Sequence, residues 1–230
     1  MRLAGWWFLL WVPLTHAYVE EIPGYEQFEA TAIKNQLSPK YVYSMALAES
    51  GHWLNDEFIP HPYAISLGVD ESVGQLKHEG FYPETKAQAE AMLSQLLKAG
   101  YRNIGVGMMQ VNIKANPDIV DDYLSLLDPT VNLSSAAKVL KWCRRYELAT
   151  DVFACYSHGS ADSTAGQHYA ARVISYASDF GDDWELKRHV KPTAIYTFEE
   201  FVSIASERYV RSPVTTRPKA PVVISSYTTQ

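Results

Sequence analysis

The stretch SPKYVYSMALAESG, residues 38–51, predicts a helix that carries a single carboxylate. Ser38 is a favourable N-cap residue, and Pro39 suits the first helical position because that position needs no backbone N–H donor. Gly51 is well placed to end the helix. Between these ends most residues are apolar or small, so the presence of Glu49 in the last turn needs an explanation.

Glu49 lies on the apolar stripe of this predicted helix. Spacings of three, four and seven residues place it on one face with Val42, Met45 and Ala46. Burial and the negative end of the helix dipole both disfavour an ionised carboxylate and raise its pKa. A carboxylic acid that stays protonated near neutral pH can act as a general acid. On this stretch alone the alternative is an ordinary surface glutamate near a helix end, so other motifs have to decide.

Helical patterns dominate the rest of the chain, which at 230 residues is long enough for one domain with extensions. Between residues 52 and 83 the pattern changes to Pro, Gly and short β-prone runs, which predicts a small β-hairpin lobe. We therefore expect a mainly α fold of the α+β type. The expected helices or helix starts are 25–36, 38–50, 85–99, Asn116-Pro117, Asp128-Pro129, Thr150, 166–180 and Thr197.

Both ends of the chain differ in composition from the middle. The first 17 residues, MRLAGWWFLLWVPLTHA, combine Arg2, an apolar run and a small-residue cleavage pattern, which predicts a secretory signal peptide. An uncleaved membrane anchor is the alternative, although the run is short for a bilayer span. The C-terminal end is rich in Pro, Thr, Ser and Val without periodicity, which predicts a flexible tail. The expected division is a signal peptide (1–17), a main domain (18–190), a helical extension (191–211) and a tail (212–230).

The net charge of the chain gives no indication of nucleic-acid binding. The formal net charge is −6, and it becomes −7 when Arg2 is removed with the signal peptide. No cluster of basic residues remains that would attract nucleic acid. No second apolar stretch is long enough to cross a bilayer, so we expect an exported and soluble mature protein. Recognition of a polymer would have to come from a cleft with aromatic and hydrogen-bonding groups.

Two cysteines, Cys143 and Cys155, flank a predicted loop between two helices. An antiparallel helical hairpin would bring them together, and export favours a disulfide. Closing so short a loop stabilises a fold by about 3 kcal/mol in the chain-entropy description. Two separate buried thiols are the alternative. We do not expect a thiol nucleophile, because no Cys-His pattern accompanies either cysteine.

The stretch NIGVGMMQVN, residues 103–112, carries polar residues without helical periodicity. Gly105 and Gly107 permit a close backbone approach, as at the wall of a cleft. Gln110 and Asn112 carry amides that both donate and accept hydrogen bonds, which suits sugar hydroxyls and N-acetyl groups. A purely structural turn is the alternative.

A third stretch, ACYSHG at residues 154–159, places Tyr156 on a predicted helix, where a tyrosine is more often core than catalytic. Taken in order, Glu49-Ser50, the GMMQ of residues 107–110 and this stretch resemble the lytic transglycosylases of the goose-type lysozyme-like superfamily. Those enzymes carry "ES" at a helix end, a "GLMQ" loop and a later "AYNAG". The resemblance covers roughly residues 28–180, and the segment from the β lobe to the GMMQ loop looks most like the transglycosylases of conjugation and type IV secretion systems.

The resemblance implies a lysozyme-like fold and cleavage of the β-1,4 bond from N-acetylmuramic acid to N-acetylglucosamine in peptidoglycan. Glu49 would protonate the leaving oxygen, and its carboxylate would then take the proton of the muramoyl C6 hydroxyl, which attacks C1 and closes a 1,6-anhydro ring. No second carboxylate is needed, since the acetamido group of the substrate stabilises C1. Tyr156 would orient Glu49 by a hydrogen bond. The residues implied in sugar binding are Ser50, Met108, Gln110, Asn112 and Tyr156.

The same resemblance implies a periplasmic protein whose partners are peptidoglycan glycan strands and proteins of a secretion or conjugation apparatus. We expect no cofactor and no metal. The histidines have no metal-ligand spacing, so core or surface imidazoles are the expectation. The five concerned, of seven histidines in the sequence, are His52, His61, His78, His158 and His168.

Two other functions stay open at this point. The third motif departs from the family pattern, because Cys155 precedes Tyr156 and Ser157-His158 replace the usual Asn-Ala pair, which leaves a non-catalytic glycan-binding assembly factor as one alternative. A hydrolytic muramidase is the other, with Asp70 or Glu71 as the second carboxylate. Solvated loop acids are the more ordinary role for both residues.

Overall fold

The computed structural model describes residues 25–54 and 57–180. The expected signal peptide, the helix starting at Thr197, the extension and the tail lie outside the described residues.

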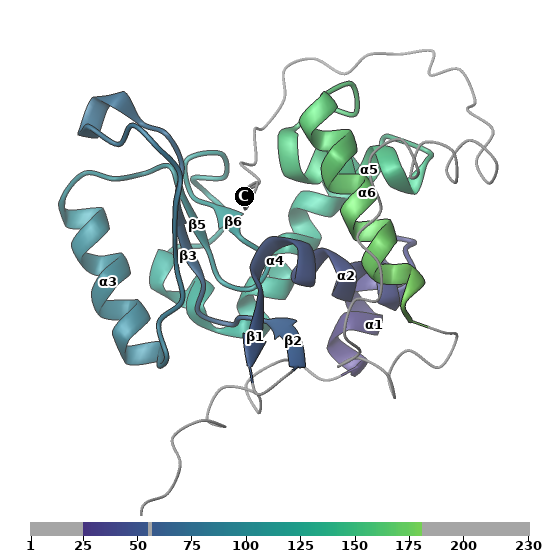
Figure 1. Cartoon of the computed structure of the whole chain (residues 1–230), viewed down its shortest axis with the longest axis horizontal. Helices are drawn as coiled ribbons and strands as arrows, with labels where there is room; N and C mark the ends of the chain where they lie inside the picture. The colour runs from purple at the N-terminus through teal and green to yellow at the C-terminus, as the bar shows by residue number, and fades with distance from the viewer. Residues whose placement is uncertain (1–24, 55–56, 181–230) are drawn as a thin grey trace, which may run out of the picture.

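The described part has a mainly helical α+β fold, as expected (Figure 1). Figure 1 shows the larger sheet with helix α3 on one side and helices α1, α2, α5 and α6 on the other. The α-helices are α1 (Tyr25–Lys34), α2 (Pro39–Ser50), α3 (Lys86–Lys98), α4 (Pro129–Cys143), α5 (Ala149–His158) and α6 (Thr164–Ser178). Two short 3-10 helices span Glu71–Val73 and Tyr123–Leu127.

The strands form two small antiparallel sheets. Strands β1 (Gly51–Leu54) and β2 (Glu57–Pro60) make a hairpin that follows α2 directly. The second sheet has the strand order β4-β3-β5-β6. Its strands are β3 (Ile65–Leu67), β4 (Glu79–Phe81), β5 (Ile104–Val106) and β6 (Val111–Asn112). The expected hairpin lobe is therefore larger than predicted, because β5 and β6 from the GMMQ region join it.

Most of the predicted helix boundaries agree with the structure because they depend on local capping groups. Thr85 and Gln88 form the expected capping box at α3, and the Asp128 side chain accepts from the first backbone N–H groups of α4. Ser38 precedes α2 but makes no side-chain cap hydrogen bond. The start predicted at Asn116 is wrong, since the segment forms a turn in which Asn116 bonds back to the Asn112 carbonyl. Helix α5 begins at Ala149, one residue before the predicted cap at Thr150.

Helix α2 lies at the centre of the core. It packs against α1 and α6, and α5 packs against α6. The Tyr43 ring of α2 makes edge contacts with Phe28 of α1, at 5.2 Å between centroids, and with Phe180, at 5.7 Å. Gly166 lets α6 approach α5 closely, because a Cβ there would lie 3.0 Å from the Ala154 carbonyl oxygen. These contacts hold the C-terminal end of α2 and one face of α6 next to each other.

The predicted disulfide between Cys143 and Cys155 is present, with a Cα–Cα distance of 5.7 Å. It joins the end of α4 to the middle of α5, which carries Tyr156. None of the helices in the described residues is both long and apolar enough to cross a membrane.

Candidate active site

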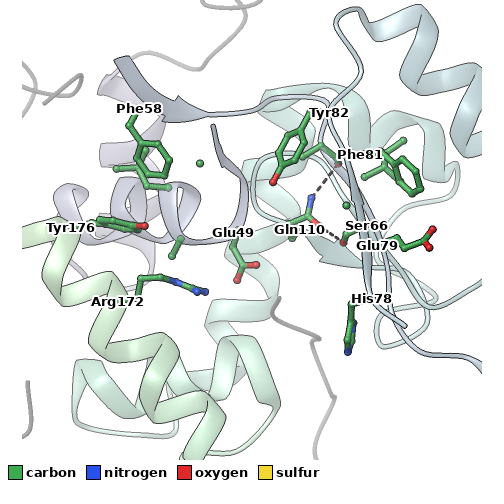
Figure 2. Close-up of a pocket in the computed structure, with 16 residues that line it drawn as sticks. Glu49, Phe58, Ser66, His78, Glu79, Phe81, Tyr82, Gln110, Arg172 and Tyr176 are labelled. Atoms are coloured by element: carbon green, nitrogen blue, oxygen red, sulfur yellow. Dashed lines mark hydrogen bonds between the residues drawn. The ribbon is translucent and has the colours of Figure 1, made fainter. Parts of the chain in front are cut away.

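A pocket of about 270 Å³ lies between two walls of the fold (Figure 2). The helix wall consists of the end of α2, Phe58 of β2 and one face of α6. The sheet wall consists of β3, β4 with its flanking residues, and Gln110. The helix-wall residues are Leu47, Ala48, Glu49, Gly51, Phe58, Arg172 and Tyr176, and the sheet-wall residues are Ala64, Ile65, Ser66, His78, Glu79, Gly80, Phe81, Tyr82 and Gln110.

Glu49 lies near the centre of this pocket, in the last turn of α2 (Figure 2). Burial raises the pKa of its carboxyl from 4.5 to about 8, against smaller lowering effects of the Tyr169 hydroxyl and the Arg172 charge. Its Oε1 atom is buried and has no hydrogen-bond partner within the described part of the chain. Glu49 is therefore protonated at neutral pH, and it faces space that a ligand can enter. The raised pKa predicted from the helix pattern agrees with this environment.

Helix α6 supplies the groups that surround the Glu49 carboxyl. Tyr169, Arg172 and Tyr176 lie three and four residues apart, so they share one side of the helix. Figure 2 shows the Arg172 guanidinium pointing toward Glu49. The buried Tyr169 hydroxyl influences the Glu49 pKa but forms no hydrogen bond of normal geometry with any described residue. The sequence interpretation missed Tyr169 and Arg172 as site residues, although it predicted the helix over residues 166–180 that carries them.

The sheet wall differs from the helix wall in its hydrogen bonding, because both the nitrogen and the oxygen of its central polar side chain have protein partners. The Gln110 amide nitrogen donates to the carbonyl oxygens of Ala64 (3.1 Å) and Gly107 (2.9 Å), and its oxygen accepts from the Ser66 hydroxyl. Gly105 leaves the space for this arrangement, since a Cβ there would lie 2.6 Å from both Ser66 Oγ and Gln110 Oε1. Gln110 thus lines the pocket as a rigid part of its wall.

Asn132 of α4 holds the GMMQ loop in place through hydrogen bonds to backbone groups. The Asn132 amide donates to the carbonyl oxygens of Val106 (2.8 Å) and Leu126 (3.0 Å), and its oxygen accepts from the Met109 N–H at 2.8 Å. Gly107 has φ of 75°, and a Cβ there would lie 2.3 Å from Asn132 Nδ2. Both reasons require a glycine at this position. Sequence reasoning missed Asn132, because nothing local links α4 to the loop.

Four of the residues predicted to bind sugar do not line the pocket, because they are buried in the scaffold behind it. Each of them is at most 1 % exposed: Ser50, Met108, Asn112 and Tyr156. The Ser50 hydroxyl donates to the Met108 carbonyl at 2.8 Å and accepts from the His61 N–H at 3.1 Å, which ties α2 to the GMMQ loop. Asn112 bonds to the Asn103 side chain and to the Ala115 N–H. Of the five predicted sugar contacts, the structure brings only Gln110 to the pocket beside Glu49.

Tyr156 does not make the hydrogen bond expected for it. Its hydroxyl donates to the Met109 carbonyl oxygen at 2.7 Å, so this proton is not directed to Glu49. Tyr156 still lies near Glu49. Burial, and to a smaller extent the nearby Glu49 charge, raise the pKa of Tyr156 well above its usual range. The hydroxyl that most affects the Glu49 pKa belongs to Tyr169. Tyr156 therefore fixes the GMMQ loop against α5.

The acids proposed for a hydrolytic mechanism lie elsewhere. Asp70 caps the 3-10 helix Glu71–Val73 and forms an ion pair with Lys114 at 2.9 Å, while Glu71 is exposed, and neither lines the pocket. The second carboxylate on the pocket wall belongs to Glu79 of β4, which forms an ion pair with the exposed Lys77 at 3.4 Å. In Figure 2 the Glu79 carboxylate points away from Glu49. The short β4 strand has no sequence signal that would have singled out Glu79.

Tyr82 of the sheet wall belongs to a small cluster of rings. Tyr82 is 41 % exposed, and its ring stacks on His52 at 4.7 Å and meets the edge of His61 at 5.3 Å. Burial, and next the His52 charge, lower the pKa of His61 to about 4. Both imidazoles support the Tyr82 ring.

Among the described residues there is no group of three or more His, Cys, Asp or Glu side chains that could hold a metal ion.

Comparison of the chain with protein-family models, with curated proteins and with solved structures finds no match.

Proposed function

We propose that this protein is a peptidoglycan lytic transglycosylase that cleaves the bond from N-acetylmuramic acid to N-acetylglucosamine and leaves a 1,6-anhydro sugar. The observation that carries the proposal is Glu49, a carboxylic acid with a pKa of about 8 that faces a pocket between helices and a sheet. A general acid works best when its pKa lies near the operating pH. Peptidoglycan is proposed as the substrate because the motifs from Glu49-Ser50 to ACYSHG, in this order, resemble those of lytic transglycosylases.

In this mechanism Glu49 acts twice on one substrate. Its proton passes to the glycosidic oxygen as the bond to the muramoyl C1 breaks, and the acetamido group of the same sugar stabilises C1. The resulting Glu49 carboxylate then accepts the proton of the C6 hydroxyl, whose oxygen bonds to C1. The C6 hydroxyl belongs to the bound sugar, so its proximity replaces an activated water. The Arg172 charge stabilises the ionised Glu49 between the two steps, because it lowers the pKa of this carboxyl.

The rest of the pocket supports a carbohydrate ligand. Phe58, Tyr82 and Tyr176 offer aromatic surface, and the bonded Gln110 side chain gives the sheet wall a fixed shape. Rigid walls reduce the ordering cost of binding. Export into the periplasm, and a role beside a conjugation or secretion apparatus, belong to the same proposal and depend on the sequence resemblance.

A hydrolytic muramidase is the second candidate, because Glu79 places a second carboxylate on the pocket wall. Inverting enzymes use such a group to activate a water, and retaining enzymes use it as a nucleophile. The orientation of Glu79 away from Glu49 favours the transglycosylase. Glu79 therefore replaces Asp70 as the first carboxylate to substitute if the products are hydrolytic.

The proposal is tested by incubating purified peptidoglycan sacculi with the mature protein and with its Glu49→Gln variant. We expect the unsubstituted protein to release soluble muropeptides and the variant to release none above background. Binding without release of fragments by either protein would favour the glycan-binding alternative, and the absence of both would rule out peptidoglycan as the substrate.

A further inference from the structure

Arg172 is a cation on the pocket wall that lacks an anionic partner in the described residues. Its Nε atom is buried and has no hydrogen-bond acceptor there, and no described carboxylate forms an ion pair with it. The guanidinium carbon lies 5.6 Å from the centroid of the Tyr169 ring, which gives a cation–π contact at long range. Arg172 is half-buried, and a buried N–H donor such as its Nε normally has an acceptor, because its removal from water is costly.

Four titratable groups around Arg172 are uncharged at neutral pH. Burial raises the pKa of Tyr169 and of Tyr176, burial followed by the Arg172 charge lowers the pKa of His158, and Glu49 keeps its proton. Asp179, at the C-cap of α6, lies near enough to Tyr176 to raise its pKa but is not ion-paired with Arg172. No described carboxylate therefore lies within ion-pair distance of this guanidinium.

The pocket leaves room for an anion next to Arg172. The guanidinium points to the same space as the Glu49 carboxyl, and the Glu79 carboxylate on the opposite wall points away and is paired with Lys77 (Figure 2). Arginine recognises carboxylates through its planar fork of N–H donors, with two parallel hydrogen bonds. The geometry thus selects a ligand that carries a carboxylate close to the bond that is cut.

We propose that Arg172 is a specificity-determining residue that binds a carboxylate of the muramoyl unit whose bond is cleaved. This inference rests on the proposed function and deepens it. The carboxylate has two sources, the lactyl group of a peptide-free muramoyl residue or the peptide that is amide-linked to that group. A neutral polymer of N-acetylglucosamine has neither, so Arg172 discriminates peptidoglycan from chitin-like glycans.

The test measures binding by calorimetry in the Glu49→Gln background, where no turnover disturbs the equilibrium. Three ligands are compared: a peptide-free tetrasaccharide with free lactyl carboxylates, the same glycan with its peptides, and chitotetraose. Arg172→Gln is the test variant, Arg172→Lys is the conservative one, and Arg102→Gln is a charge-matched control outside the pocket, where the Arg102 side chain bonds to the carbonyls of Leu97 and Tyr101.

We expect Arg172→Gln to weaken binding of at least one carboxylate-bearing ligand by tenfold or more and to leave chitotetraose affinity within twofold. Loss for the peptide-free glycan identifies the lactyl carboxylate, and loss confined to the peptide-bearing glycan identifies the peptide. Arg172→Lys should retain part of the affinity, and it carries the test if Arg172→Gln does not fold. An equal loss for all three ligands, or no loss for any, would overturn the inference. If the Glu49→Gln protein with an intact Arg172 binds none of the glycans, the proposed function fails and this inference with it.

Discussion

On the helix wall of the pocket, Glu49 Oε1 and Arg172 Nε have no hydrogen-bond partner among the described residues, whereas on the sheet wall the Gln110 side chain makes three hydrogen bonds. The helix wall is also where burial shifts a carboxyl pKa to about 8. Unbonded buried polar groups reduce stability, and those on a pocket wall are free to bond to a ligand. This difference supports the proposal that the helix wall supplies the reacting groups and that the sheet wall gives the pocket its shape.

Substitutions on the helix wall should reduce activity with little loss of stability, because few bonds are lost. Substitution of a residue that holds the sheet wall by hydrogen bonds, such as Asn132, should reduce the free energy of unfolding. Such a substitution leaves buried carbonyl and N–H groups without partners.

The largest effect is expected for Glu49→Gln. The amide has nearly the same shape and no charge, so the fold should remain, while the proton donor is lost. We expect the rate of peptidoglycan cleavage to fall by about 10³-fold or more, measured as release of soluble muropeptides. Circular dichroism and the thermal midpoint serve as the control for folding. A variant that keeps more than a tenth of the activity would remove Glu49 from the mechanism.

The sheet wall should respond in the opposite way to Asn132→Ala. This substitution removes the bonds to the Val106 and Leu126 carbonyls and to the Met109 N–H, all in the buried support of the GMMQ loop. We expect the free energy of unfolding to fall by about 3 kcal/mol, measured by denaturant titration. An Asn132→Asp variant keeps the acceptor, loses both donors and buries a carboxyl against two carbonyl oxygens, so it should be at least as destabilised as Asn132→Ala. Equal stability of Asn132→Ala and the unsubstituted protein would contradict the assignment of a supporting role.

A smaller effect concerns the pH dependence of stability. Because the pKa of Glu49 is about 8 in the folded state and 4.5 otherwise, the folded protein holds an extra proton between these values. The free energy of unfolding should therefore fall as pH rises from about 4.5 to about 8. Relative to Glu49→Gln, the loss should amount to roughly 2 kcal/mol, which allows for the solvent that reaches this residue.

The difference between the two proteins is the quantity to measure in that experiment. His61, whose pKa is lowered to about 4, changes stability in the opposite direction below its usual pKa, and this contribution cancels because both proteins contain it. A difference that does not change between pH 5 and pH 9 would show that Glu49 ionises normally.

The smallest effect is expected for Glu79→Gln on the sheet wall. Its carboxylate points away from Glu49 and is paired with an exposed lysine, so the transglycosylase mechanism makes no use of it. We expect less than a threefold change in the cleavage rate. A loss comparable to that of Glu49→Gln would instead assign the catalytic second carboxylate to Glu79 and favour the muramidase.

The parts of the fold that the sequence predicted correctly depend on local signals. The Ser38-Pro39 start of α2, the capping box at α3 and the Cys143–Cys155 pair are all readable from residues close together in the chain. The apolar stripe of α2 likewise predicted the environment of Glu49. Local capping and periodicity carry this information because they act within a few residues.

The rest of the site depends on contacts between distant segments, which no local pattern reveals. Tyr169 and Arg172 reach Glu49 only because α6 packs against α2, and Asn132 reaches the GMMQ loop only through the position of α4. Motif residues such as Ser50 and Tyr156 were expected to touch sugar, but a motif cannot distinguish a residue that holds the wall from one that faces the ligand.

The chemistry of the released sugar distinguishes the proposed transglycosylase from a hydrolase most directly. Muropeptides from a digest of purified sacculi are analysed by mass spectrometry before and after borohydride treatment. If Glu49 acts on the C6 hydroxyl without an activated water, the fragments carry 1,6-anhydromuramic acid, lack one water relative to lysozyme products and have no end that borohydride reduces. Fragments with a reducible muramic acid end would contradict the account.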